Sequence, residues 1–175
     1  MRDLWVFGYG SLIWRPGFAF EEAVPGLLRG SHRSLCIYSW VHRGTETRPG
    51  LVLGLDRGGA CRGMAFRVAE KNRDEVIAYL REREQATMVY REVERPVRLS
   101  GGSRETVTAL TYVADRKHPQ YAGVLSLERQ VEIVRGAAGQ SGPNPDYVIN
   151  TVNHLHQLGI RDVGLEALGH RLSGA

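Results

Sequence analysis

The stretch "LWVFGYGSLIW", residues 4–14, places two glycines directly after a run of apolar and aromatic residues. Such a run, followed by turn residues, is typical of a buried β-strand. Gly8 and Gly10 match the first two glycines of a dinucleotide-binding fingerprint, but Ile13 stands where the third glycine belongs. Residues 14–17 predict a turn and no following helix. The glycines therefore indicate either a structural turn or a backbone loop that binds an anion.

Further strand-like segments follow over the first two-thirds of the chain, at residues 27–40, 50–56, 61–68, 91–99 and 105–115. The last two alternate in polarity and are joined at "SGGS", residues 100–103, which predicts a β-hairpin. Helical periodicity appears at residues 70–84 and returns at 126–139 and 144–159, with a short terminal helix from Asp162. Strands first and helices last favour an α+β fold built around an antiparallel or barrel-like sheet, with a helical C-terminal part.

Several residues have the chemistry of helix ends. A capping box is predicted from Asn72 to Glu75, and Ser126 and Asn144 are predicted as N-caps. Pro145 suits the first helical position, and Gly159 suits the position after a last turn. These residues set the expected limits of the helices.

The composition is that of a soluble globular protein, with 175 residues, 42% hydrophobic and 24% charged. The length fits one domain, residues 1–175. We find no apolar run that could span a membrane and no export signal at the N-terminus. The two cysteines lie far apart, which suits a reducing compartment and predicts a cytoplasmic protein. The net charge is +4, but the arginines alternate with acids, so no nucleic-acid partner is expected.

Two common kinds of catalytic site are not supported. Neither Ser11 nor Ser141 lies in the GxSxG pattern of serine hydrolases. His154 and His156 are two residues apart, whereas zinc-binding helices place their histidines four apart. We therefore predict neither a metal site nor a serine nucleophile.

One carboxylate in the helix at 70–84 stands apart from the others. At about 100° per residue, Val76, Ile77 and Leu80 share one face, and Glu84 falls roughly 35° from its centre. Glu82 falls on the opposite side. An inward carboxylate is costly unless paired, and partial desolvation raises its pKa toward the range of a general base. Glu84 is therefore either a general base or the partner of an arginine.

Four motifs occur together in a fixed order. They are "VFGYGSLIW" at 6–14, "HRG" at 42–44 with Pro49-Gly50 beyond, Arg83-Glu84 followed by Tyr90, and "GQSGPNPDY" at 139–147. Together they resemble the ChaC family of γ-glutamylcyclotransferases, in its glutathione-specific branch, from about residue 4 to residue 170. The resemblance implies a small, mixed β-barrel-like fold with flanking helices.

The resemblance also implies a reaction and a site. The α-amine of a γ-glutamyl group attacks its own γ-carbonyl, which releases cysteinylglycine from glutathione and closes 5-oxoproline. By position, Glu84 matches the catalytic acid/base. The residues that match the substrate-binding part are Tyr9, Gly10, Ser11 and Leu12, with Tyr147 and Arg43 as further pocket residues. The reaction needs neither a metal nor another cofactor, so none is expected.

One departure from the family pattern bears on the substrate. The family often has a glycine shortly before the tyrosine that follows the Arg-Glu pair, and here Met88 lies in that area. Other γ-glutamyl amino acids or amines are therefore alternative substrates. A non-catalytic module that binds a small molecule in the same pocket is the alternative from another class.

Overall fold

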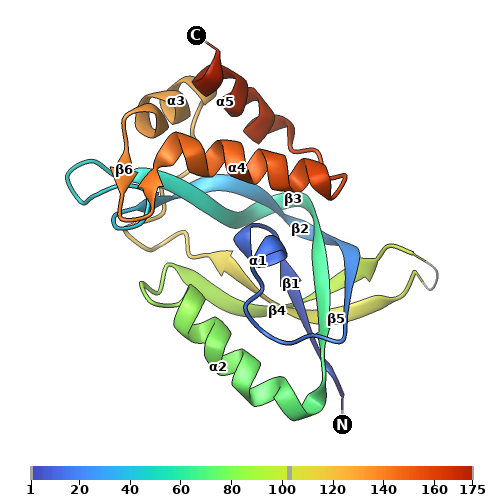
Figure 1. Ribbon diagram of the computed structural model, residues 1–175. Coiled ribbons are helices and arrows are strands. Elements are labelled where there is room, and N and C mark those ends of the chain that lie inside the picture. Colours follow the sequence, from blue (N-terminus) through green and yellow to red (C-terminus); the bar gives the residue numbers. More distant parts are fainter. Residues whose placement is uncertain (1, 102–103, 175) are drawn as a thin grey trace. The chain divides into compact units, whose positions relative to one another are not determined.

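Five strands close into a barrel in the computed structural model, which describes residues 2–101 and 104–174 (Figure 1). In barrel order the strands are β1 (Leu4–Gly8), β3 (Gly50–Val68), β2 (Glu22–Ser39), β4 (Tyr90–Leu99) and β5 (Thr106–Ala114). β1 pairs antiparallel with β3 and parallel with β5, whereas β4 pairs antiparallel with both β2 and β5. The predicted α+β fold with a mixed, mostly antiparallel barrel is confirmed.

The chain divides into two compact units. The first comprises Met1–Arg33 and Leu55–Asp115, and the second comprises Ser34–Gly54 and Arg116–Ala175. β2 and β3 each run from one unit into the other, because the boundaries fall within these two long strands. That all 175 residues form one domain stays a prediction.

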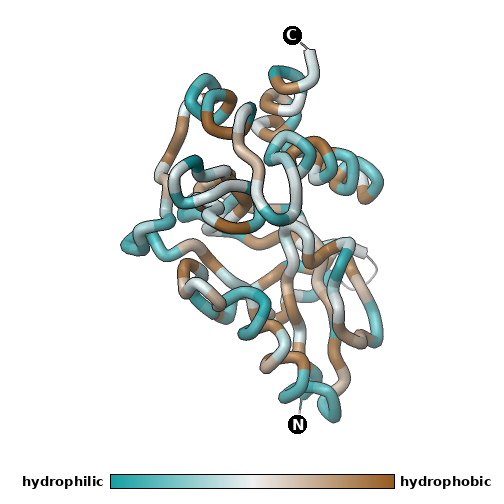
Figure 2. The backbone as a smooth tube through the Cα atoms, turned by 60° about the vertical axis from the view of Figure 1, so that its left-hand side comes forward, coloured by the Kyte–Doolittle hydropathy of each residue, from teal (hydrophilic) through white to brown (hydrophobic). Residues whose placement is uncertain are grey.

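The helices fall into two sets. The first unit holds α1 (Ser11–Trp14), the 3₁₀ turn η1 (Glu70–Asn72) and α2 (Arg73–Glu84). The second unit holds α3 (Leu127–Arg135), α4 (Asn144–Gln157) and α5 (Val163–Ser173), with the short strands β6 (Ala138–Gly139) and β7 (Gly142–Pro143). Hydrophobic and hydrophilic residues alternate along the turns of the C-terminal helices (Figure 2), as the helical periodicity predicts.

Several boundaries differ from the sequence-based prediction. The strand predicted from residue 27 begins at Glu22, and the helix predicted over 126–139 ends at Arg135, before β6. Residues 50–56 and 61–68 form the single strand β3, because Gly58 and Gly59 adopt positive φ and let the backbone bend without ending the strand. Residues 11–14, partly predicted as a turn, form the helical turn α1. The hydrogen bond from the Ile13 N–H to the Gly10 carbonyl closes this turn before the chain reverses at Gly17.

The predictions at helix ends had mixed outcomes. Ser126 caps α3 by accepting from the N–H of Arg129, and Asp162 caps α5 in the same way. Gly159 adopts a φ of +72° shortly after α4 ends. The predicted hairpin is present as β4 and β5, although residues 102–103 of its "SGGS" turn lie outside the described residues.

Two predicted caps are wrong. Asn72 makes no side-chain cap, because it already belongs to the turn η1, where its own N–H donates to the carbonyl of Ala69. Pro143 occupies the N-cap position of α4. Asn144 is therefore the first residue of the helix, and Pro145 is the second. The buried Asn144 amide instead pairs with the backbone of Leu51 in β3 through two hydrogen bonds of 2.8 and 2.9 Å.

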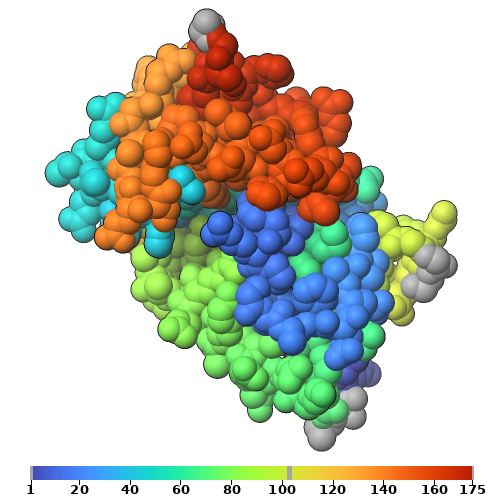
Figure 3. Space-filling view, in the orientation of Figure 1, coloured from blue at the N-terminus to red at the C-terminus, as the bar shows by residue number. Residues whose placement is uncertain are grey.

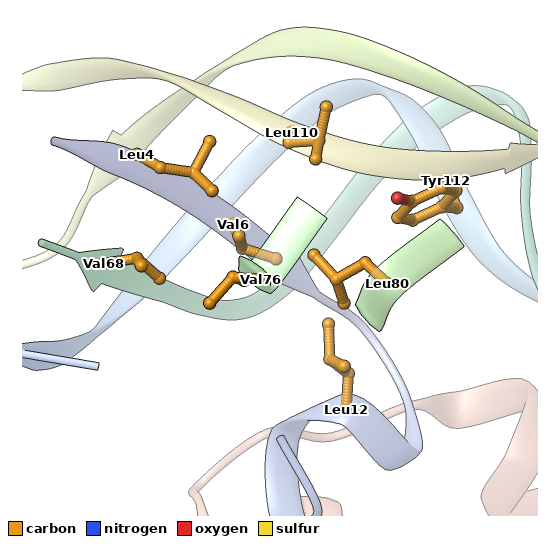
Figure 4. Packing of buried hydrophobic residues seen from close by; sticks show 8 residues of the cluster. All are labelled: Leu4, Val6, Leu12, Val68, Val76, Leu80, Leu110 and Tyr112. Atoms are coloured by element: carbon orange, nitrogen blue, oxygen red, sulfur yellow. The ribbon is translucent and has the colours of Figure 1, made fainter. Parts of the chain in front are cut away.

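The apolar face of α2 packs against the barrel wall of the first unit. Figure 4 shows this cluster, in which Leu12 of α1 points toward Leu80 of α2. Its buried members are Leu4, Val6, Leu12, Val68, Val76, Leu80, Leu110 and Tyr112. Burying a side chain of this size contributes about 1.5–3 kcal/mol relative to leaving it exposed. The cluster therefore fixes α2 on the barrel next to the turn that follows β1.

Met88 lies between α2 and β4 with a φ of +60°, and it is 61% exposed. This left-handed conformation costs a non-glycine residue roughly 1–2 kcal/mol. We expect Met88→Gly to raise the free energy of unfolding by about 1 kcal/mol or less, since the greater freedom of unfolded glycine offsets part of the gain.

Ala86→Gly is the matched control in urea denaturation. Ala86 is an exposed residue of the same connection and has no positive φ, so this change should lower the free energy of unfolding by about 0.4–1 kcal/mol. Equal destabilisation by both substitutions would contradict the role given to the Met88 backbone.

Candidate active site

The turn at residues 9–12 follows the end of β1 and includes the first two residues of α1. The backbone carbonyl of Tyr9 accepts a hydrogen bond of 2.6 Å from Nε of Arg33, and Nη2 of Arg33 donates to the carbonyl of Arg62. Gly10 and Leu12 are buried, Tyr9 is half-buried and Ser11 is exposed. The guanidinium of Arg33 thus fixes the start of the turn from β2.

Glu84 is the last residue of α2, and its side chain is only 19% exposed, whereas Glu82 is exposed. The predicted inward orientation of Glu84 is confirmed. Burial raises the pKa of the Glu84 carboxyl, and the positive charge of Arg83, whose Nε lies 3.5 Å from Oε1, opposes that rise. Glu84 is therefore both partly desolvated and paired with an arginine.

Arg83 also reaches the turn after β1. Its Nη2 donates to Oγ of Ser11 at 3.1 Å, so one guanidinium contacts both Ser11 and Glu84. In the space-filling view the blue segment that follows β1 lies against the green surface of α2 (Figure 3). Of the five candidate residues of the first unit, Ser11 and Glu84 are thereby joined through Arg83.

The buried phenol of Tyr112 interacts with the charge of Glu84. The hydroxyl of Tyr112 on β5 donates to Oε2 of Glu92 at 2.9 Å, and Arg81 binds both carboxylate oxygens of Glu92 at 3.0 Å. Arg81 holds the pKa of Glu92 below its usual range. Burial, the bond to Glu92 and the nearby charge of Glu84 all raise the pKa of Tyr112, so this phenol stays protonated.

The other two candidates, Tyr147 and Arg43, lie in the second unit and contact each other. The guanidinium carbon of Arg43 is 5.5 Å from the ring centre of Tyr147, within the range of a cation–π interaction. Arg43 also donates to the carbonyl of Pro143, and the Tyr147 hydroxyl accepts from the N–H of Leu53. The structure joins these two residues as one pair within the second unit.

The glycines of the two motifs in the second unit have a packing role. A Cβ at Gly139 would lie 2.3 Å from the carbonyl oxygen of Val41, and one at Gly44 would lie 2.1 Å from the backbone nitrogen of Gly50. The backbone N–H groups of Gln140 and Ser141 also donate to the carbonyls of Val41 and His42. These glycines are therefore required by close backbone contact.

Arginines were the residues that sequence reasoning missed. The sequence pattern indicates Arg83 only as the neighbour of Glu84 in a motif and gives no signal for Arg33. Their contacts with the turn join residues 72 and 24 positions apart, which no local pattern indicates. The many arginines in the chain also gave no reason to choose these two.

Metal and membrane sites find no support in the part of the chain that the structure describes. Across residues 2–101 and 104–174, no group of three or more His, Cys, Asp or Glu side chains is arranged to hold a metal ion. His154 is half-buried, and the exposed His156 bonds to Glu166. None of the helices described has the length and apolar character needed to cross a membrane.

The sequence matches the ChaC-like protein family over residues 4–173, and the chain therefore belongs to this family. It is 34% identical to the glutathione-specific γ-glutamylcyclotransferase of Escherichia coli (strain K12) over 165 residues, which cover 94% of this chain and 71% of that protein. It is 32% identical to the human glutathione-specific γ-glutamylcyclotransferase 1 over 160 residues, which cover 90% and 72% of the two chains.

The fold is also that of solved cyclotransferases. The crystal structure of the yeast γ-glutamylcyclotransferase specific to glutathione superposes with a TM-score of 0.88 at 21% identity, covering 98% of this chain and 96% of that one. A second γ-glutamylcyclotransferase superposes with a TM-score of 0.56 at 15% identity, covering 95% and 86%.

The raised pKa of Glu84 predicts a pH-dependent stability. The folded state binds the Glu84 proton more tightly than the unfolded state, so stability from this group is full below the ordinary pKa of 4.5 and is lost as pH rises through the folded value. Glu84→Gln removes the charge. It should raise the free energy of unfolding at pH 8 and bring a smaller gain at pH 4.

Glu82→Gln, on the exposed side of the same helix, is the control and should show no such pH dependence. Denaturant unfolding at both pH values measures the difference. A gain for Glu84→Gln that is equal at pH 4 and pH 8 would show that the charge is not the cause.

Proposed function

We propose that this protein is a γ-glutamylcyclotransferase that cleaves glutathione, with Glu84 as general acid/base. The curated relatives from Escherichia coli and human carry that activity in their names. The observation that carries the proposal is the partly buried Glu84 carboxylate, joined through Arg83 to Ser11 of the glycine turn. The products are 5-oxoproline and cysteinylglycine.

The reaction requires one group that can accept a proton and later donate it. The substrate's α-amine is mostly protonated near pH 7, because such amines have pKa values of about 7.7–8.0. The Glu84 carboxylate removes one proton, and the amine nitrogen then attacks the γ-carbonyl carbon. When the amide C–N bond of the tetrahedral intermediate breaks, the same proton goes to the nitrogen of the departing cysteinylglycine. The ring nitrogen loses its second proton to solvent, which leaves the neutral lactam of 5-oxoproline. A carboxyl whose pKa is raised by burial suits both steps.

The turn after β1 suits the negative charges of the substrate. The backbone N–H groups of residues 10–12 lie in this turn, between the end of β1 and the first turn of α1. Arg33 and Arg83 bring positive charge to the same turn. We infer that it holds the α-carboxylate of the γ-glutamyl group or the developing oxyanion, where one such donor is typically worth about 3–4 kcal/mol. The roles of Tyr147 and Arg43 in binding stay predictions.

The substrate is tested by product analysis. The purified protein should form 5-oxoproline from glutathione, with cysteinylglycine in equal amount, and should form much less from γ-glutamyl-alanine. A reversed preference would assign another γ-glutamyl substrate, and Met88 would then be the first residue to exchange for glycine. Binding of glutathione without any 5-oxoproline would indicate a binding module.

The base is tested by Glu84→Gln, which keeps the shape of the side chain and removes its basicity. We expect kcat to fall by about 10²–10⁴-fold, the usual range for a general acid/base, while glutathione binding by calorimetry changes little. Glu82→Gln is the matched control and should keep the kcat of the unmodified protein. A near-normal rate for Glu84→Gln would exclude this base.

A further inference from the structure

The guanidinium of Arg83 meets acceptors from two segments of the first unit. Besides Ser11 and Glu84, its Nη1 donates to the carbonyl of Arg15 at 2.5 Å and to that of Pro16 at 3.3 Å. It also donates to the hydroxyl of Tyr79, one turn earlier on α2, at 3.1 Å. The Arg83 side chain is 22% exposed. Its bonds to Tyr79 and Pro16 are partly buried, whereas those to Ser11 and Arg15 are exposed.

These contacts use the shape of arginine. A guanidinium carries five N–H donors in a rigid plane, whereas a lysine ammonium is a single point charge on a flexible stem. The Nη2 side of the Arg83 plane faces Ser11, the Nη1 side faces the carbonyls that end α1, and Nε faces Glu84. One side chain thus fixes the distance between the turn and the carboxylate.

The charge of Arg83 acts on the same carboxylate. Arg83 lowers the pKa of Glu84 against the larger effect of burial. Tyr112 of β5 also interacts with Glu84, and its phenol is uncharged near neutral pH. Arg83 therefore places a positive charge next to the Glu84 carboxylate and favours its ionised state.

We propose that Arg83 is a positioning residue that locks the Ser11 turn and the Glu84 carboxylate into one arrangement and supplies the charge that keeps this carboxylate ionised. The proposal rests on the proposed function for its effect on rate. Misplacement of a reacting group by about 1 Å can cost about 10²-fold in rate. Both roles, fixed distance and charge, are separable by substitution.

The first experiment measures rate against pH. Arg83→Gln removes the charge and the planar set of N–H donors, so kcat should fall by about 10²-fold and the acidic limb of the kcat/KM profile should move to higher pH. Arg83→Lys keeps the charge without the planar set of donors, so the limb should stay near that of the unmodified protein while kcat remains low. Arg73→Gln is the control, because it removes the same charge from the first residue of α2, about 16 Å along the helix from Glu84.

The second experiment does not depend on turnover. The Glu84 carboxyl is titrated by ¹³C NMR, with its signal assigned by its loss in Glu84→Gln, and its pKa should rise in Arg83→Gln but not in Arg73→Gln. A double-mutant cycle of Arg83→Gln and Ser11→Ala in denaturant unfolding should show a coupling between the two sites.

The outcomes separate the two proposals. If the unmodified protein makes no 5-oxoproline from any γ-glutamyl donor, the proposed function fails, while the titration and the cycle still decide the role of Arg83. An unchanged Glu84 pKa with no coupling to Ser11 would overturn that role. The role of Arg83 would also be overturned if Arg83→Gln lowered the stability of the protein but kept its kcat and the acidic limb of its kcat/KM profile unchanged.

Discussion

Holding the Glu84 carboxylate partly out of water costs free energy, and its contacts in the first unit offset this cost. Glu84 ends a helix whose apolar face packs on the barrel, so its side chain is drawn toward the core with that face. The carbonyl end of a helix carries partial negative charge, which disfavours a further negative charge there and favours a cation. Arg83 supplies this cation, because it lies in the same last turn of α2. Its guanidinium also faces Glu84 and offsets the negative charge there.

The same arginine explains why the N-terminal turn and α2 belong to one arrangement. The apolar side of the turn after β1 packs on the core: Leu12 and Ile13 are buried, and the partly buried Tyr9 packs against a core cluster of the barrel. Its polar side is held by guanidinium groups, with Arg33 on the Tyr9 carbonyl and Arg83 on Ser11. Arginine can bridge several carbonyls at once, so a short turn becomes rigid without a longer helix.

Periodicity predicted much of this protein. The strand-like segments, the hairpin of β4 and β5, and the inward direction of Glu84 follow from spacing, because each depends on residues close in sequence. The continuity of β3 through Gly58 and Gly59 could not be predicted, since glycine pairs usually indicate turns.

Contacts between distant residues were beyond the reach of the pattern. The bond between Arg83 and Ser11 depends on how α2 lies on the barrel, which no local spacing fixes. Asn144 was predicted as a helix cap from its type and its place before Pro145. Its amide instead pairs with Leu51, 93 positions away, an alternative that a sequence window does not show.

That pairing has a consequence for solubility. The Asn144 amide engages the backbone N–H and C=O of Leu51, and two residues further along β3 the Tyr147 hydroxyl accepts from the N–H of Leu53. Groups on alternate residues of a strand point to the same edge, and an uncovered edge is a template for pairing with another chain. The first turn of α4 therefore acts as a side-chain substitute for a neighbouring strand, which guards this margin of the sheet against aggregation.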